Sequence, residues 1–211
     1  NAYHSAEYIK DMGTPDRLIK VENDLRSGKI ERLNNENKRK AIFIDRDGVI
    51  NKEVHYLFEI EKFEFIRGIF KTCKYFLNLG YKLIVITNQS GISRGYYSEN
   101  DFIKINQWML AEFEKNGVLI SDVFYCPHSS EDNCLCRKPL PGMILNAQKK
   151  HKIDLTKSWL IGDKETDIIA ANKSGITKTV LVRSGHQIDE SSSNANFIVD
   201  SIYDLKKIIK N

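Results

Sequence analysis

The stretch that decides the fold is Ala41–Gly48, which reads AIFIDRDG. Its first four residues are all apolar, and Ile and Phe favour strands. A strand covered on both faces shows such an unbroken apolar run, whereas a half-exposed strand alternates apolar and polar residues. We therefore expect a buried strand of a parallel sheet, with Asp45 placed directly after its end.

Further short apolar runs alternate with helical patterns along the rest of the chain. The runs are Leu83–Ile86, Val123–Tyr125, Trp159–Ile161, Val180–Val182 and Phe197–Val199. The helical patterns lie near residues 67–79, 99–115, 141–151, 165–174 and 202–210. Strand–helix alternation predicts the α/β class, as a three-layer Rossmann-like parallel sheet with helices on both faces.

Composition excludes several classes of protein. The 211 residues carry 32 Lys+Arg against 28 Asp+Glu, a net charge of +4 that does not call for nucleic acid. The longest apolar runs are of strand length, so we expect no membrane span. Charge throughout the first 30 residues argues against a secretory signal peptide.

The residues before about position 39 differ in character from the rest. They are polar, with a turn at residues 13–15, a predicted helix from Asp16 to about Ser27, and a linker that includes Asn34, Asn35 and Asn37. We therefore divide the chain into an N-terminal extension, residues 1–38, and a main domain, residues 39–211. Because the chain starts at Asn1 rather than Met, we expect it to be a processed or truncated piece.

Chemically active side chains follow the predicted strands, and ligands bind beyond the carboxyl ends of such strands. Asp45 and Asp47 would repel one another unless a divalent cation or a shared proton lay between them. Asp163, after another strand, could complete an oxygen site for Mg²⁺. Thr87 supplies a hydroxyl and Lys138 a positive charge for a phosphate. Together these groups predict phosphoryl transfer.

Three of the four cysteines crowd around one histidine. The order is Cys126-x-His128, five residues, then Cys134-x-Cys136. Three thiolates and one imidazole form a closed set for structural zinc. A reduced loop without metal is the alternative. The clustering also predicts a reducing compartment, most simply the cytoplasm. Cys73 stands apart, and we expect it to be buried on a helix.

Residues 40–210 resemble the haloacid dehalogenase superfamily of phosphatases. The matching motifs are Asp45–Val49, Thr87, Lys138 and Gly162–Asp167. Within it the chain resembles the D-glycero-D-manno-heptose 1,7-bisphosphate 7-phosphatases. That resemblance rests on Thr87–Gly95, Cys126–His128, Cys136–Met143 and Val180–Gly185. It implies the haloacid dehalogenase fold, with a zinc-binding loop in place of a large cap domain.

The resemblance also implies a mechanism. Asp45 would be the nucleophile and form an aspartyl phosphate. Asp47 would be the general acid and then the general base. Mg²⁺ would be held by the Asp45 carboxylate, the Asp47 carbonyl and Asp163. Thr87 and Lys138 would hold the transferring phosphoryl group.

The expected substrate is a small-molecule sugar bisphosphate of nucleotide-activated heptose biosynthesis. Arg137, a planar bidentate donor, would bind its second phosphate, unless it is a solvated surface charge. The residues expected to line the sugar site are Glu53, His55, Tyr56, Asn88, Gln89, Ser90 and Lys164.

Residues Tyr8–Pro15 resemble the end of sugar-1-phosphate nucleotidyltransferases, in which Asp11 would correspond to an acid that assists the metal. The expectation is a fragment of a bifunctional transferase–phosphatase, with an unrelated extension as the alternative. Such a chain would carry two consecutive steps, removal of the 7-phosphate and activation of the remaining 1-phosphate. Because transferases of this kind commonly couple α-configured sugar 1-phosphates, the resemblance implies the α-anomer of the substrate. Two other functions stay open: histidinol-phosphate phosphatase, which shares the short spacer in the cysteine cluster, and an inactive zinc-stabilised binding module.

Overall fold

The computed structural model describes residues 12–27, 29 and 38–210. The chain divides into two compact units, residues 1–39 and 40–211, and each is described by itself. In the first unit, helix α1 spans Pro15–Arg26, which confirms the predicted helix within one residue at each end. Proline suits the first turn of a helix because it has no N–H to satisfy. Tyr8–Asp11 and the predicted linker asparagines lie outside the described residues.

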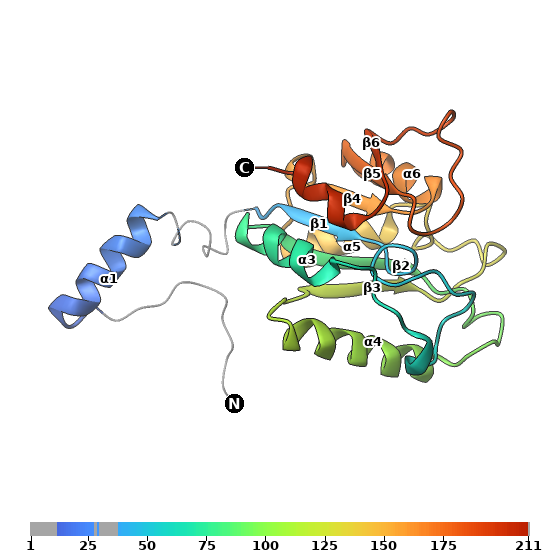
Figure 1. Ribbon diagram of the computed structural model, residues 1–211, viewed down its shortest axis with the longest axis horizontal. Coiled ribbons are helices and arrows are strands. Elements are labelled where there is room, and N and C mark those ends of the chain that lie inside the picture. The colour runs from blue at the N-terminus through green and yellow to red at the C-terminus, as the bar shows by residue number, and fades with distance from the viewer. Residues whose placement is uncertain (1–11, 28, 30–37, 211) are drawn as a thin grey trace. The chain divides into compact units, whose positions relative to one another are not determined.

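The second unit is built on a six-stranded, wholly parallel sheet in the order β3-β2-β1-β4-β5-β6 (Figure 1). The strands are β1 (Ala41–Ile44), β2 (Lys82–Asn88), β3 (Asp122–Cys126), β4 (Trp159–Gly162), β5 (Lys178–Val182) and β6 (Phe197–Val199). The helices are α3 (Ile69–Asn78), α4 (Glu99–Lys115), α5 (Gly142–His151) and α6 (Glu165–Ser174). Short 3₁₀ turns are η1 (Ile60–Lys62), η2 (Leu155–Lys157) and η3 (Ile202–Lys207).

Strand β1 is apolar throughout because both of its faces are covered. Ile42 and Ile44 pack into a core shared with α3, α4 and η3. Ala41 and Phe43 face the opposite way, into a second core shared with α5 and α6. All four side chains are fully buried. The predicted fold class, a parallel sheet between two helical layers, is confirmed. Cys73 is also confirmed as a buried residue on a helix, α3.

The helical pattern near residues 202–210 is shorter than the sequence indicated and takes the 3₁₀ form. It is η3, which ends at Lys207. Ile202 and Leu205 are three residues apart and both fully buried. A 3₁₀ helix has three residues per turn, so it places both on the sheet side. Among the described residues, no helix has the length and apolarity needed to cross a membrane.

Candidate active site

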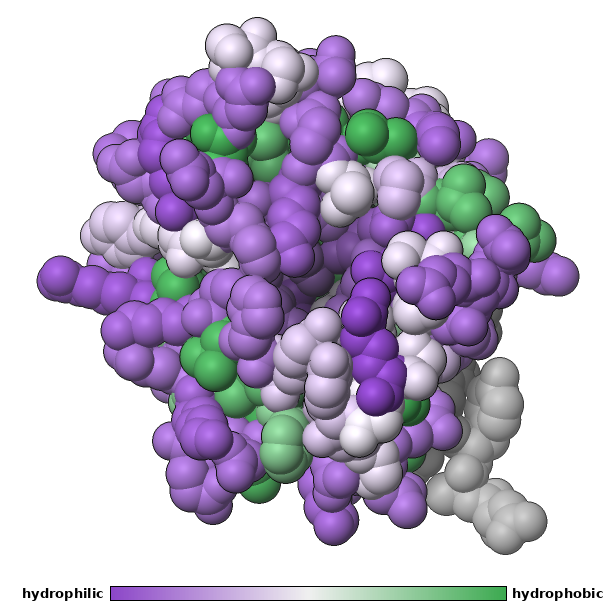
Figure 2. Space-filling view, turned by 90° about the vertical axis from the view of Figure 1, so that its right-hand side faces the viewer, coloured by the Kyte–Doolittle hydropathy of each residue, from purple (hydrophilic) through white to green (hydrophobic). Residues whose placement is uncertain are grey.

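Polar side chains from three neighbouring strands meet beyond the carboxyl edge of the sheet. Asp45 follows β1, Thr87 lies near the end of β2, and Asp163 follows β4. The chain leaves β1 toward β2 and later returns on the other side at β4, which opens a crevice between the strand ends. A cavity of about 180 Å³ lies there, and Figure 2 shows a hollow framed mainly by hydrophilic residues. It is lined by residues 45–47, 53–57 and 87–91 and by Tyr97, Lys138, Lys164, Thr166, Asp167 and His186.

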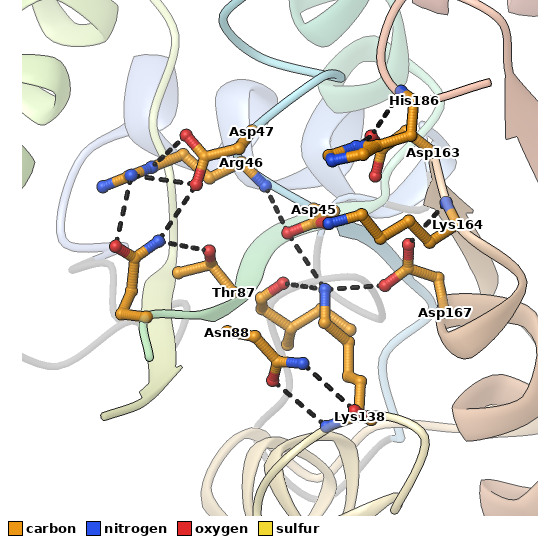
Figure 3. Close-up of polar contacts among 12 residues, drawn as sticks. Asp45, Arg46, Asp47, Thr87, Asn88, Lys138, Asp163, Lys164, Asp167 and His186 are labelled. Carbon is orange, nitrogen blue, oxygen red and sulfur yellow. Dashed lines mark hydrogen bonds and ion pairs between the residues drawn. The ribbon is translucent and has the colours of Figure 1, made fainter. Parts of the chain in front are cut away.

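Lys138 joins two buried carboxylates at the floor of this cavity (Figure 3). Its Nζ lies 2.9 Å from Asp45 Oδ1 and 2.6 Å from Asp167 Oδ1, and it donates to the Ile86 carbonyl at 3.0 Å. Burial alone would lower the pKa of Lys138, but the charges of Asp167 and Asp45 raise it above its ordinary value. The ammonium group is therefore a fixed positive charge beside Asp45.

Burial raises the pKa of Asp45 to about 6. Lys138 opposes this shift, whereas the charges of Asp167 and Asp47 add to it. Crowding of carboxylates in a buried place is costly without a cation to balance them. The electrostatics of the cavity therefore favour binding of a further positive charge next to Asp45.

Asp163 is 1% exposed and is held on one side only. Its Oδ2 accepts from the backbone N–H of His186 at 3.0 Å and lies 2.6 Å from His186 Nδ1. Gly185 gives it room, because a Cβ at that position would lie 2.2 Å from Oδ2. The other oxygen, Oδ1, is buried and has no hydrogen-bond partner among the described residues.

Ligand oxygens of Asp45, Asp163 and Asp167 all lie within 4.8 Å of one another. A cluster of carboxylate oxygens, one of them buried and unpartnered, has the donor chemistry that Mg²⁺ prefers. The residues present therefore fit a divalent cation between Asp45 and Asp163. Asp167 is already engaged by Lys138 and by the backbone N–H of Lys164.

Asp47 lies beside the cavity with donors on both oxygens. Oδ1 accepts from Arg46 Nε and from Asn51 Nδ2, each at 3.0 Å. Oδ2 accepts from Arg46 Nη2 at 2.9 Å and from Gln89 Nε2 at 3.0 Å. Four donors hold the carboxylate in one orientation.

Most of the residues expected to bind substrate do line the cavity. These are Glu53, His55, Tyr56, Asn88, Gln89, Ser90 and Lys164. Arg137 does not line it, and its Nη1 instead donates to the His128 carbonyl at 3.1 Å. Asn88 binds the backbone of Lys138 through both ends of its amide, at 3.1 Å each. Asn88 therefore fixes the segment that carries Lys138.

The cysteine cluster comes together as the sequence predicted. Cys126 Sγ lies 3.5 Å from Cys134 Sγ and 3.1 Å from Cys136 Sγ, and His128 Nδ1 lies 3.3 Å from Cys136 Sγ. All four cysteines of the chain are free. Around a tetrahedral zinc, the usual Zn–S and Zn–N lengths place neighbouring ligand atoms of such a set roughly 3.5–3.8 Å apart. The observed distances are somewhat shorter, so small side-chain movements bring the four ligands to a closed zinc site. Cys136, the last of them, lies two residues before Lys138.

Among the cavity residues that were not expected from the sequence, four have titratable side chains: Arg46, Tyr97, Asp167 and His186. Arg46 and Asp167 lie inside stretches that the motifs contain, but nothing in their spacing indicated where their side chains point. His186 follows β5, so the rule of polar residues after strand ends could have found it. Tyr97 carries no such signal, because it reaches the cavity from the loop before α4.

The sheet, the strand-end carboxylates and the buried lysine define a hydrolase of the haloacid dehalogenase-like class. The family model for HAD-hydrolase-like proteins matches residues 135–205. A solved structure of the D,D-heptose 1,7-bisphosphate phosphatase from B. bronchiseptica shares the fold, with a TM-score of 0.69 and 24% identity over 80% of this chain and 96% of that one. A putative HAD-like phosphatase from Mesorhizobium loti has a TM-score of 0.68 and 28% identity over 77% of this chain and 81% of that one.

Curated relatives narrow the class. The D-glycero-α-D-manno-heptose-1,7-bisphosphate 7-phosphatase of Photorhabdus laumondii is 44% identical over 82% of this chain and 98% of its own length. The D-glycero-β-D-manno-heptose-1,7-bisphosphate 7-phosphatase of Pasteurella multocida is 42% identical over 82% of this chain and 97% of its own length. The chain belongs to the D-glycero-D-manno-heptose 1,7-bisphosphate 7-phosphatase family, and it is an enzyme of the phosphatase class.

Proposed function

We propose that this chain hydrolyses the 7-phosphate of D-glycero-D-manno-heptose 1,7-bisphosphate through an aspartyl phosphate at Asp45. The observation that carries the proposal is the buried group of Asp45, Lys138 and Asp163 beside Thr87, at the edge where the strands end. Relatives that are 42–44% identical over nearly their whole length are named for this reaction.

Asp45 and Asp163 are the carboxylates that we assign to Mg²⁺, together with the Asp47 carbonyl. The unpartnered Oδ1 of Asp163 supports this assignment, as does the raised pKa of Asp45. The B. bronchiseptica structure, which shares the fold, is a complex with magnesium and phosphate. A bound Mg²⁺ supplies positive charge for the phosphoryl oxygens and lowers the repulsion between the two anions that must meet.

Asp45 attacks the phosphorus, and the bond from phosphorus to the sugar oxygen breaks. Thr87 and Lys138 bind the phosphoryl oxygens, on which negative charge is concentrated. Asp47 gives its proton to the departing sugar oxygen. It then takes a proton from the water that attacks the aspartyl phosphate. Inorganic phosphate leaves, and the Asp45 carboxylate is restored.

The second phosphate of the substrate needs a cation at the mouth of the cavity. Lys164 lines the cavity and is the residue to which we assign this phosphate. Arg137 would have to turn away from the His128 carbonyl to contribute. The glutamate, histidine and tyrosine of Glu53–Tyr56, with Ser90, line the remaining space in which the sugar would lie.

We assign Zn²⁺ to Cys126, His128, Cys134 and Cys136, as a structural metal. The four ligands leave no position open for water, so this metal takes no part in hydrolysis. Cys136 is two residues before Lys138, and only Arg137 lies between them. An ordered metal loop therefore helps to hold the lysine that pairs with Asp45.

Residues 1–38 are proposed to be the remnant of a nucleotidyltransferase domain and its linker. The support is the resemblance of Tyr8–Pro15, of which only Met12–Pro15 lie within the described residues. None of the residues of helix α1 is buried.

A panel of substrates tests the proposed function. We expect Mg²⁺-dependent phosphate release from heptose 1,7-bisphosphate, with kcat/KM at least about a hundredfold above that for histidinol phosphate, a difference of about 2.7 kcal/mol. Histidinol phosphate is included in the panel because histidinol-phosphate phosphatases share the short, five-residue spacer of the cysteine cluster. A preference for histidinol phosphate would replace the proposal with that activity. Absence of turnover on every substrate would favour a binding module.

The anomer of the substrate is a separate prediction. Relatives named for the α-anomer and for the β-anomer both match the chain, so the choice rests on the N-terminal resemblance. Such transferases couple α-configured sugar 1-phosphates, and we expect kcat/KM to favour the α-anomer by about tenfold, equivalent to about 1.4 kcal/mol. Kinetics on both anomers measure the ratio.

The Arg137→Ala substitution tests which cation binds the second phosphate and so distinguishes the two anomers. Loss of the preference would place the second phosphate on Arg137, whereas an unchanged preference would leave that phosphate to Lys164. A wild-type preference for the β-anomer would contradict the inference from the N-terminal segment.

A further inference from the structure

The amide of Gln89 has no hydrogen-bonding capacity left for a sugar. Its side chain is 2% exposed. Oε1 accepts from the Tyr97 hydroxyl at 2.6 Å and from Arg46 Nη2 at 3.2 Å. Nε2 donates to Asp47 Oδ2 at 3.0 Å and to Thr87 Oγ1 at 2.7 Å. A carboxamide accepts two hydrogen bonds through its oxygen and donates two through its nitrogen, so all four positions are filled.

The two sides of this amide cannot be exchanged. A flipped amide would point an N–H group at Arg46 Nη2, which can only donate, whereas the Tyr97 hydroxyl could turn to accept. It would also turn its oxygen toward the Asp47 carboxylate, and both mismatches would lie in a buried place, where unpaired polar groups are costly. Arg46 and Asp47 therefore fix the direction in which the N–H groups of Gln89 point.

One nitrogen thus connects the proposed acid/base to the hydroxyl that is proposed to bind phosphate. Asp47 Oδ2 receives one N–H of Gln89. Arg46 donates to both oxygens of the same carboxylate (Figure 3). Thr87 Oγ1 receives the second N–H, which leaves the hydroxyl proton of Thr87 to serve as a donor in the cavity that it lines.

We propose that Gln89 is a positioning residue for the acid/base Asp47, and that it makes no contact with the sugar. The inference rests on the proposed function, in which Asp47 gives and takes the proton. Displacement of a proton-transfer group by about 1 Å can cost about a hundredfold in rate. A residue that acts in this way changes kcat, whereas a residue that binds the sugar changes KM.

The test replaces Gln89 with Met, which keeps the length of the side chain and removes both N–H groups. For heptose 1,7-bisphosphate we expect kcat to fall by about tenfold to a hundredfold, with KM within about threefold of wild type. The control is Gln148→Met, which makes the same chemical change at a half-buried residue of α5. We expect it to change neither kcat nor KM. Gln89→Glu keeps an acceptor for Tyr97 and Arg46 and removes the donor, so it serves where the Met variant does not fold.

A second substrate separates positioning of Asp47 from a general disturbance. p-Nitrophenyl phosphate releases nitrophenolate, which needs no proton when it leaves. In stopped flow, the Gln89 substitutions should therefore slow the first turnover of this substrate less than the steady-state turnover that follows. In that later phase Asp47 must activate water. This substrate also keeps the test independent of the identity of the sugar.

Three results would overturn the inference: kcat within about threefold of wild type in a folded variant, a rise in KM for the heptose substrate alone, or equal slowing of both phases with the aryl substrate. Failure of the wild type on heptose bisphosphate, with turnover of the aryl substrate, would instead count against the proposed sugar.

Discussion

Replacement of Asp45 with Asn is expected to reduce turnover by at least about a thousandfold, because it removes the nucleophile and one of the carboxylates assigned to Mg²⁺. The substitution changes little volume at this buried position. Lys138 would keep its other ion pair, with Asp167 at 2.6 Å. Phosphate release with saturating Mg²⁺ measures the effect, and thermal melting shows whether the fold is retained.

The control for this substitution is Asp189→Asn, which makes the same change on an exposed loop. The Asp189 side chain binds only the nearby serines Ser191 and Ser192 in the contacts described here. We expect it to leave turnover at the wild-type level. Activity of Asp45→Asn within about tenfold of wild type would contradict the role assigned to Asp45.

Loss of one zinc ligand is expected to have the largest effect on stability. Cys134→Ser should lower the free energy of unfolding by about 3–5 kcal/mol, because metal binding and folding of this loop are coupled. For a chain of this size that corresponds to about 6–20 °C in melting temperature. Zinc analysis should find one ion per chain in the wild type, purified without chelator, and less in the variant.

Leu135→Ser is the matched control because Leu135 lies between two of the ligands and is 80% exposed. It changes the same loop without removal of a ligand, and we expect full zinc content and an unchanged melting temperature. Wild-type protein without zinc, or a Cys134→Ser variant as stable as Leu135→Ser, would refute the structural metal site.

The sheet could be predicted from the sequence because its strands are buried on both faces. Residues 41–44 need apolar side chains on both sides, and the pattern shows this directly. The strand-end rule then locates Asp45, Thr87 and Asp163 at one edge of the sheet. The cysteine cluster could also be predicted from the sequence, because close spacing along the chain limits how far its ligands can separate.

What the sequence did not reveal is the direction of individual side chains. Arg137 directly precedes Lys138, yet Lys138 points to Asp45 while Arg137 points to the His128 carbonyl. Asp167 pairs with Lys138 at the floor of the cavity, although the two residues are 29 positions apart along the chain. Such choices depend on which partners the finished fold brings near each residue, and no local pattern encodes them.

The position of the bond that is broken decides whether this chain is a 7-phosphatase. Phosphorus NMR follows heptose 1,7-bisphosphate during incubation with the wild-type protein and Mg²⁺. We expect the signal of the 7-phosphate ester to disappear and inorganic phosphate to appear in equal amount. The signal of the 1-phosphate should remain. Loss of the 1-phosphate signal, or persistence of both ester signals while another phosphate ester is hydrolysed, would contradict the proposed function.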